Sequence, residues 1–294
     1  MRVRAFAKIN LSLRVVATRD DGYHELRTIF QSIALHDTLT FTRRRGGFAL
    51  SADDPACPAD DTNLIWRAAD RMWKASGRRG AARDVAVQVK KRIPLQAGLG
   101  GGSSDAAAAL RVFARLWRVD GTAVRDAAAA LGADVPYFLE GGTALGLDRG
   151  DLLFPLIDRP PAWVVLVLPA FGVSTKEAFT WWDATARRGG SGRSGRSGGS
   201  ASERTRGFLS NSELANDLEA PVAARHPEIA RIVRALRARH AIQAAMSGSG
   251  SAVFGLFERR ADAARAAAAL ASKARRTVLT RTLNRSKYQR LAAT

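Results

Sequence analysis

The sequence predicts a protein that mixes helices and strands in two domains, and three observations lead to this fold class. Its 294 residues exceed the usual length of a single domain. Segments with the two-residue period of strands alternate with segments of helical period. The pattern restarts after the proline-rich stretch 155–161, so we expect a first domain at residues 1–157 and a second at 158–294.

In the first half, strand and helix periodicity are easily distinguished. Apolar side chains alternate with polar ones in the expected strands at 1–16 and 85–93. Residues 28–41 are rich in Ile, Phe, Leu and Thr and are expected to form one or two further strands. Apolar side chains recur every three to four positions in the expected helices, at 63–76, 105–117 and 122–131. Gly77 and Gly132 follow two of these helices, where glycine commonly ends a helix.

The second half begins with a continuous apolar run, WVVLVL at 163–168, which is typical of a strand buried on both faces. A helix at 227–240, a strand at 251–257 and an alanine-rich helix at 262–274 are expected after it. Residues 187–206 consist almost wholly of Arg, Gly and Ser and have little to bury. We therefore expect a flexible loop there.

The formal net charge is +19, which raises the question of a nucleic-acid partner. Residues 187–206 carry six Arg and one Glu, and residues 259–294 carry ten Lys or Arg and one Asp. These two segments supply 14 of the 19 charges, so the excess is peripheral. We interpret them as a solvated loop and a solvated tail, and expect no specific nucleic-acid partner.

Cysteine, histidine and apolar content exclude several other classes. Cys57 is the only cysteine, so no intramolecular disulfide can form and a reducing compartment is expected. One cysteine and four scattered histidines indicate no zinc-type cluster, and we assign no metal site to the protein. No apolar run approaches about 20 residues, and the N-terminal segment alternates like a strand, so we expect a cytoplasmic protein without a membrane partner.

The segment PLQAGLGGGSSDAAAAL carries the strongest functional signal, because a strand leads into a glycine cluster and a helix leads out. Such glycines can adopt positive φ, so that consecutive backbone N–H groups converge on an anion. Two serine hydroxyls offer further donors and an expected N-cap, and the helix dipole favours the same anion. This predicted phosphate turn consists of Pro94, Leu95, Gln96, Ala97, Gly98, Leu99, Gly100, Gly101, Gly102, Ser103 and Ser104.

A flexible glycine loop is the alternative interpretation, but the strand–turn–helix context favours anion binding. The turn is not of the Walker type, because G-x-x-x-x-G-K-[ST] is absent from the sequence. GLGGGS departs from the dinucleotide pattern G-x-G-x-x-G at its last position, and no acidic ribose partner follows about 20 residues later. We interpret Asp105 as a first-turn residue that complements the helix dipole, rather than as a catalyst.

The turn resembles the ATP loop of the GHMP kinases, P-x-x-x-G-L-G-S-S-A-A. Its longer form GLGGGSSDAAA is typical of the branch that acts on 4-diphosphocytidyl-2-C-methyl-D-erythritol. Four further segments agree with that branch, in the family's order and at compatible spacing over most of the chain. They are AKINL at 7–11, DGYH at 21–24, GADVP at 132–136 and SGSGS at 247–251.

The resemblance implies a two-domain α+β fold, with a ribosomal-protein-S5-like N-terminal domain, a ferredoxin-like C-terminal domain and an active site between them. It implies transfer of the γ-phosphoryl group of ATP, expected to be accompanied by Mg²⁺, to the 2-hydroxyl of that cytidyl substrate. Another GHMP kinase, acting on homoserine, mevalonate or a sugar, is the first alternative, and a basic nucleic-acid binding protein is the second. We expect a monomer or a homodimer.

The same resemblance assigns the catalytic pair. Asp134 matches the family's catalytic aspartate, although alone it is typical of a turn or a helix cap. Lys8 matches the catalytic lysine, although alone it is typical of the exposed face of a strand. We expect the Lys8 ammonium to pair with Asp134. Asn10, on the same face of the strand as Lys8, is expected to hydrogen-bond the substrate.

Tyr23 and His24 match the family's cytidine end, where an aromatic face can stack on a pyrimidine. An ordinary hairpin with a half-buried Tyr is the alternative. Phe179 is either a second stacking ring or a core residue. Ser247 and Gly248 are small enough for backbone to approach the reacting groups from the second domain, or they form a simple turn.

A further segment and three departures from the family pattern complete the comparison of motifs. Asn216 and Asp217 match a family segment near the substrate. Gln96 stands where a small residue is common, Asp148 replaces a frequent glycine, and the 187–206 loop is unusual in length and composition. None of the three departures removes a predicted catalytic residue.

Overall fold

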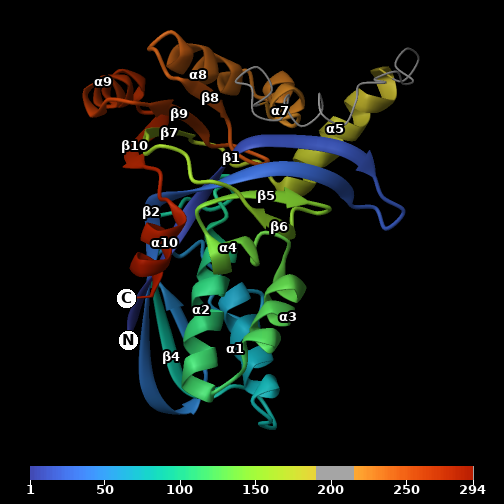
Figure 1. Cartoon of the computed structure of the whole chain (residues 1–294), viewed down its shortest axis with the longest axis vertical. Helices are drawn as coiled ribbons and strands as arrows, with labels where there is room; N and C mark the ends of the chain where they lie inside the picture. The colour runs from blue at the N-terminus through green and yellow to red at the C-terminus, as the bar shows by residue number, and fades with distance from the viewer. Residues whose placement is uncertain (190–214, 294) are drawn as a thin grey trace.

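The structure is a computed structural model of the whole chain, in which residues 1–189 and 215–293 are described. Helices cover two β-sheets, one from each half of the sequence (Figure 1). The first sheet and its helices lie in the lower and middle parts of Figure 1, and the second sheet lies above them. The two sheets fall on either side of residue 157.

A long hairpin forms the centre of the first sheet. The strand order is β3-β4-β2-β5-β6, and β1 pairs with β2. The second half of β2 pairs with β4 and its first half with β5, so that β2 joins the two ends of the sheet. The strands are β1 (Arg2–Thr18), β2 (His24–Gly47), β3 (Ala49–Ala52), β4 (Arg83–Lys90), β5 (Thr143–Leu147) and β6 (Leu152–Pro155).

Helices with one apolar face close the first core. They are α1 (Leu64–Ala75), α2 (Gly101–Trp117), α3 (Gly121–Leu131) and the short α4 (Tyr137–Glu140). Asn63 caps α1, because its side chain accepts the N–H of Ile65, and Ile65, Ala68 and Met72 then face the core. In α2 the rings of Phe113 and Trp117 stack, with their centroids 4.7 Å apart.

Strand β1 is buried on both faces, and this property positions the site. Ala7, Ile9 and Leu11 pack in one cluster with apolar residues of the second sheet. The alternating residues Lys8 and Asn10 are also buried, at 4% and 2% exposure, and line a cavity. The polar face of this strand segment therefore forms part of the cavity wall and is not on the open surface. This rules out the alternative that Lys8 is an ordinary surface lysine.

The second sheet has the ferredoxin-like arrangement that the sequence motifs imply. Its strands are β7 (Trp163–Pro169), β8 (Gln243–Met246), β9 (Val253–Phe257) and β10 (Arg275–Arg281). They lie in the order β10-β7-β9-β8, which is 4-1-3-2 in chain order. The helices are α5 (Thr175–Gly189), α7 (Glu219–Arg225), α8 (Glu228–Arg237) and α9 (Arg260–Leu270).

The end of the chain returns to the first sheet as helix α10 (Arg285–Ala292). The Leu283 N–H donates to the carbonyl of Ser32, and the Tyr288 hydroxyl donates to the carbonyl of Phe138 at 2.6 Å. Phe6, Leu283 and Tyr288 belong to one small buried cluster. The last residues thus help to hold the first sheet although they follow the second.

The expected strands and helices are all present, with shifted ends, but the two basic segments differ from prediction. The expected solvated tail at 259–294 is wrong, because α9, β10 and α10 occupy most of it. Of the expected loop 187–206, residues 187–189 belong to α5, and the remainder lies outside the described residues. Arg-rich stretches can fold in this way because their aliphatic stems pack while the charged heads stay in water.

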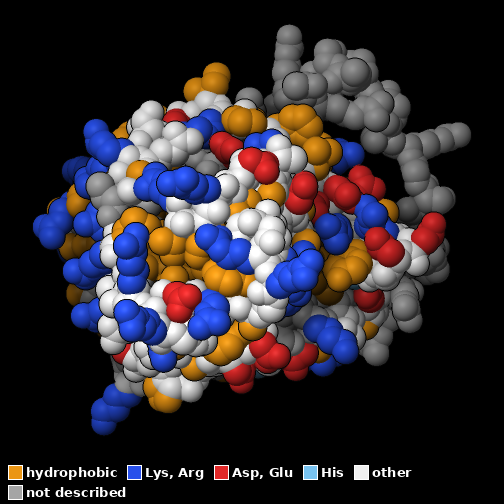
Figure 2. Space-filling view, turned by 90° about the horizontal axis from the view of Figure 1, so that it is seen from below, with side chains coloured by type: hydrophobic (Ala, Val, Ile, Leu, Met, Phe, Trp, Pro, Cys, Tyr) orange, Lys and Arg blue, Asp and Glu red, His pale blue; other side chains and the backbone are white. Residues whose placement is uncertain are grey.

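Figure 2 shows Lys and Arg side chains over the face seen from below, separated by uncharged and acidic side chains. They form no single continuous basic groove on that face. Within residues 1–189 and 215–293, no helix is long and apolar enough to cross a membrane.

Candidate active site

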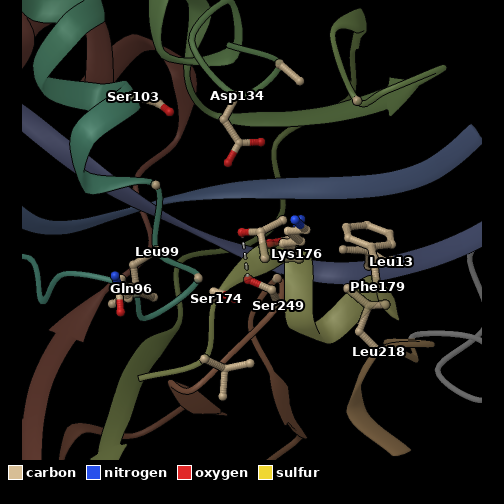
Figure 3. A pocket seen from close by; sticks show the side chains of 18 of the residues that line it. Leu13, Gln96, Leu99, Ser103, Asp134, Ser174, Lys176, Phe179, Leu218 and Ser249 are labelled. Carbon is tan, nitrogen blue, oxygen red and sulfur yellow. Dashed lines mark hydrogen bonds between the residues drawn. The ribbon is translucent and has the colours of Figure 1, made fainter. Parts of the chain in front are cut away.

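A cavity of about 1040 Å³ lies between the two halves of the chain. The phosphate turn, the first two strands, the start of α5 and the segment after β8 all contribute to its walls. Figure 3 shows Gln96, Leu99 and Ser103 on one side and Phe179 on the other, with Asp134 pointing into the space between. The predicted phosphate site and the predicted aromatic site therefore share one cavity.

The phosphate turn needs glycine at two positions for internal reasons. Gly98 and Gly100 have φ of +71° and +70°. A Cβ on Gly98 would lie 2.1 Å from the carbonyl oxygen of Ser247, and one on Gly100 would lie 2.6 Å from the Phe138 ring. A Cβ on Gly102, which lines the cavity, would meet nothing within 4 Å. The bare backbone at Gly102 therefore leaves room for a ligand rather than for protein atoms.

Helix α2 begins inside the turn, at Gly101, with Gly100 as its N-cap. The expected serine N-cap is wrong, because Ser104 already donates its N–H to the Gly100 carbonyl at 2.9 Å within the helix. The N–H groups of residues 101–103 precede the first intrahelical bond and carry the positive end of the helix dipole. Backbone donors with no helical acceptor thus stand at the cavity wall.

The two serines of the turn have different surroundings. Ser103 lines the cavity. Ser104 is buried, and its hydroxyl donates to the carbonyl of Phe6 at 2.7 Å, which ties α2 to β1. The expected role of the Ser104 hydroxyl as a donor to the ligand is therefore wrong, because the strand carbonyl already accepts it.

Lys8 and Asp134 meet across the cavity wall, as expected. Lys8 Nζ lies 3.4 Å from Asp134 Oδ2 and donates to Asn10 Oδ1 at 2.6 Å. The Lys8 side chain is 5% exposed and that of Asp134 is 33% exposed. A buried ammonium with an accessible carboxylate can orient that carboxylate toward a bound alcohol.

A chain of hydrogen bonds fixes the Lys8 side chain. Asn10 Nδ2 donates to Thr28 Oγ1 at 2.7 Å, and the Thr28 hydroxyl donates to the carbonyl of Ser12 at 2.7 Å. Irregularities in the β1–β2 register occur just before Lys8 and just after Asn10. β-bulges at such positions redirect side chains, so the irregular register helps to aim this pair into the cavity.

The aromatic end of the cavity is built on α5. The His24 ring stacks on Phe179, with ring centroids 4.6 Å apart, and meets the Trp182 ring edge-on at 5.5 Å. His24 Nε2 lies 2.8 Å from Asp183 Oδ1. Because a carboxylate only accepts, a neutral His24 carries its proton on Nε2 and leaves Nδ1 as an acceptor.

Tyr23 is the exposed member of this end, with 58% of its surface accessible. The Arg149 guanidinium lies 5.5 Å from its ring centroid, a cation–π contact, and both residues line the cavity. Arg149 also donates to Asp151 Oδ2 at 2.5 Å. One side of the Tyr23 ring is thus already covered, and one face of Phe179 is covered by His24.

The SGSGS segment docks against the phosphate turn. Ser247 is fully buried, and its hydroxyl donates to the carbonyl of Gly98 at 3.0 Å. Gly248 and Ser249 line the cavity, whereas Ser247 does not. Asn216 holds this segment, since its Nδ2 donates to the carbonyls of Met246 and Gly248.

Asp217 does not reach the cavity wall. Its carboxylate accepts the N–H of Val15 at 3.0 Å and pairs with Arg14 at 2.8 Å. Asn216 and Asp217 thus hold β1 and the SGSGS segment together across the interface between the two halves of the chain.

Family models agree with this geometry. Residues 63–142 match the model for GHMP kinases N terminal domain, and residues 204–276 match the model for GHMP kinases C terminal. The chain belongs to the GHMP kinase family. The two matches together cover more than half of its length.

Among relatives, the 4-diphosphocytidyl-2-C-methyl-D-erythritol kinase of Moorella thermoacetica is 43% identical over 291 residues, covering 95% of this chain and 98% of the relative. The enzyme of the same name from Pelotomaculum thermopropionicum is 39% identical, with 95% and 97% covered. This GHMP kinase is therefore similar to these relatives over almost its whole length.

Solved structures agree at the level of the fold. A crystal structure of 4-(cytidine 5'-diphospho)-2C-methyl-D-erythritol kinase matches with a TM-score of 0.76 and 35% identity, covering 96% of this chain and 99% of that one. The homoserine kinase of Cytophaga hutchinsonii matches with a TM-score of 0.67 at 16% identity, which shows a shared fold alone. The implied two-domain α+β GHMP kinase fold is confirmed.

Several residues of the cavity in this GHMP kinase were not predicted from its sequence. Arg149, Lys176, Asp183 and Ser249 all line it. Ser249 lies within a quoted motif, so the signal for it was present. Asp183 belongs to an amphipathic helix, α5, whose period could have been recognised. Nothing local marks Arg149, which reaches the site because the β5–β6 turn packs on the β1–β2 hairpin.

No metal ligand set emerges from the described part of the chain. Among residues 1–189 and 215–293, no group of three or more His, Cys, Asp or Glu side chains could hold a metal ion. The described residues thus offer no preformed cage of protein ligands for Mg²⁺.

Proposed function

We propose that this chain is an ATP-dependent kinase that phosphorylates the 2-hydroxyl of 4-diphosphocytidyl-2-C-methyl-D-erythritol, a step of isoprenoid precursor biosynthesis by the non-mevalonate route. One observation carries the proposal: a single cavity joins the phosphate turn, the Lys8–Asp134 pair and the Tyr23–His24 hairpin. Relatives that bear this name are 39–43% identical over nearly the full chain.

The phosphate turn would hold the ATP phosphates. The free N–H groups at 101–103, the helix dipole and the Ser103 hydroxyl all favour a negative charge there. Gly102 leaves the space that a phosphate needs to reach the backbone. Mg²⁺ would enter with ATP, since phosphoryl transfer generally requires it, and we assign it no protein ligand.

Asp134 would act as the base. Phosphoryl transfer depends mainly on position and on compensation of charge, so the carboxylate must face the attacking hydroxyl and accept its proton. Lys8 would hold Asp134 in place and stabilise the developing alkoxide. The hydrogen bonds from Lys8 to Asn10 and from Asn10 to Thr28 keep the ammonium from turning away.

The hairpin and α5 would bind the cytidyl group. The open face of Tyr23 can stack on the pyrimidine. With its Nε2 held by Asp183, His24 offers Nδ1 as an acceptor for the exocyclic amine of cytosine. Arg149 and Lys176 line the same cavity and supply positive charge for a diphosphate.

The test is turnover of ATP with a panel of alcohols: the cytidyl substrate, homoserine, mevalonate and a sugar. We expect turnover of the cytidyl substrate alone. Asp134→Ala should lower kcat by about 10³-fold or more with folding intact, whereas the exposed Asp126→Asn on α3 should leave kcat unchanged. Turnover of homoserine or mevalonate, with none of the cytidyl substrate, would reject the proposal.

A further inference from the structure

Three buried charged side chains lie beneath the phosphate turn. Lys91 Nζ donates to Asp37 Oδ2 at 2.5 Å and to Asp105 Oδ2 at 2.8 Å. The side chains of Lys91, Asp37 and Asp105 are 4%, 0% and 5% exposed. Two carboxylates therefore share one ammonium in a site that excludes water.

This cluster connects both ends of the phosphate turn. Lys91 directly follows β4 and leads into the turn, Asp105 lies in α2 just beyond it, and Asp37 comes from β2. A Cβ built on Gly101 would lie 3.5 Å from Lys91 Nζ. The buried charges thus lie close to the backbone donors that face the cavity. The expected first-turn role of Asp105 is wrong, because its carboxylate is buried in this cluster.

The two carboxylates accept different numbers of hydrogen bonds. Asp37 accepts three hydrogen bonds, from Lys91 Nζ and from the N–H groups of Arg92 and Ile93. Asp105 accepts one, and its buried Oδ1 has no hydrogen-bond partner among the described residues. An ionised carboxylate with an unpartnered buried oxygen is costly, so Asp105 is more easily protonated than Asp37.

The acid–base balance of the cluster agrees with its geometry. Burial, together with the charge of Asp37, raises the pKa of Asp105 to about 7, although the Lys91 ammonium opposes the shift. Besides Lys91 and Asp37, Cys57 faces the cluster, and burial raises the pKa of its thiol, which stays neutral. Asp53 accepts the N–H of Lys91 at 2.7 Å from outside the cluster.

A triphosphate on the turn would add several negative charges beside this cluster. With both carboxylates ionised the cluster carries −1, and with Asp105 protonated it is neutral. Repulsion between like charges therefore favours the protonated form when an anion is bound. We propose that Asp105 is a proton-linked positioning residue: it gains a proton when ATP occupies the turn, and affinity for ATP falls as pH rises through neutrality. This inference rests on the proposed function only in taking ATP as the ligand of the turn.

The first test uses the unaltered protein and a non-hydrolysable ATP analogue with saturating Mg²⁺. Its Kd, measured from pH 6 to pH 8.5 at constant ionic strength, should rise by about 3- to 10-fold as Asp105 ionises in the free protein. Calorimetry at pH 7.5 in buffers of different ionisation enthalpy should show uptake of a fraction of a proton on binding. No proton uptake, or a Kd that falls with pH, would overturn the proposal.

The second test compares Asp105→Asn with Asp126→Asn, an exposed aspartate on α3. The asparagine at position 105 keeps the shape of the side chain and mimics its neutral form. Its Kd for the analogue should be nearly independent of pH and close to the low-pH value of the unaltered protein, and its proton uptake should be smaller. Asp126→Asn should retain the full pH dependence, since ionisation of the analogue is common to both variants.

A purely structural role for Asp105 predicts a different result for Asp105→Asn: weaker binding of the analogue at every pH, with the same pH dependence of the Kd as in the unaltered protein. This result would overturn the proposal. The readout involves no acceptor alcohol. If the enzyme turns over homoserine in place of the cytidyl substrate, the proposed function fails while the proton linkage still holds. If the Kd for the analogue does not change with pH while the cytidyl substrate turns over, only the proposed proton linkage fails.

Discussion

The two ends of the cavity are built differently. At the reaction end, Lys8, Asn10 and Thr28 are almost completely buried and connected by hydrogen bonds. Neighbouring atoms leave no room for a Cβ on Gly98 or Gly100. At the nucleoside end, Tyr23 is 58% exposed, and Arg19 pairs with Asp148 on the surface. The proposed reaction end is thus held by buried contacts, whereas the proposed nucleoside end combines the nearly buried His24 side chain with exposed ones such as Tyr23.

This difference follows from what each end must do. Proton transfer needs groups held within hydrogen-bond distance of the reacting atoms, which only a tightly packed region can provide. A nucleoside must enter and leave, and its rings can be recognised by stacking on a partly exposed side chain. Substitutions should therefore have large effects at the reaction end and graded effects at the nucleoside end.

The largest effect is expected for Lys8→Met. Loss of the ammonium removes the group that orients Asp134, while the similar length of the side chain preserves packing. We expect kcat to fall by about 10³-fold and the affinity for an ATP analogue to change little. Lys74→Met, at an exposed position of α1, is the control for loss of a charge. A kcat within tenfold of the original would show that Lys8 only fills space.

Gly98→Ala should be the most damaging single change to stability in the turn. The new Cβ would lie 2.1 Å from the Ser247 carbonyl oxygen, and φ is already +71°. We expect the free energy of unfolding to fall by about 2–3 kcal/mol, measured by urea denaturation. A loss below about 1 kcal/mol would show that the SGSGS segment can move aside.

Gly102→Ala separates ligand binding from stability in the same turn. No protein atom lies within 4 Å of the new Cβ, and Gly102 is helical, so stability should stay constant or rise by about 0.5–1 kcal/mol. The methyl group would occupy space at the cavity wall, so the KM for ATP should rise about tenfold. An unchanged KM would indicate that the phosphates do not approach this part of the backbone.

Tyr23→Ala should have a moderate effect confined to the nucleoside end. Loss of one stacking ring costs about 1–3 kcal/mol in single-stranded nucleic-acid sites, so the KM for the cytidyl substrate should rise about tenfold or more. Because Tyr23 is exposed, the melting temperature and the KM for ATP should not change. Steady-state kinetics with each substrate varied in turn would check this. Equal changes in both KM values would argue against a separate nucleoside end.

The smallest effect is expected for Asp148→Gly. Asp148 has φ of +59°, which a glycine adopts without strain, and this explains why a glycine is frequent here in the family. The change also removes the exposed pair with Arg19, and such pairs contribute little. The two effects should offset to within about 0.5 kcal/mol of unfolding free energy. A loss above about 1.5 kcal/mol would show that the hairpin depends on this pair.

The sequence by itself determined the features that local rules govern. Gly98 and Gly100 could be predicted because no other residue easily adopts their backbone angles, and the helix and strand periods located most of the major elements. Lys8 and Asp134 were identified because each lies in a short segment that matches a motif of the family. Their meeting at 3.4 Å needed the fold, since 126 positions of chain separate them.

Only the tertiary structure decided which polar groups face a ligand and which face the protein. Ser104 and Asp105 follow Ser103 directly, yet the Ser104 hydroxyl bonds to β1 and the Asp105 carboxylate to Lys91. Likewise Asp183 acquires its role from His24, which lies far away in the sequence. Local periodicity places a side chain on a helix or a strand. Its partner depends on which distant elements pack together, and the spacing of residues along the chain does not reveal this packing.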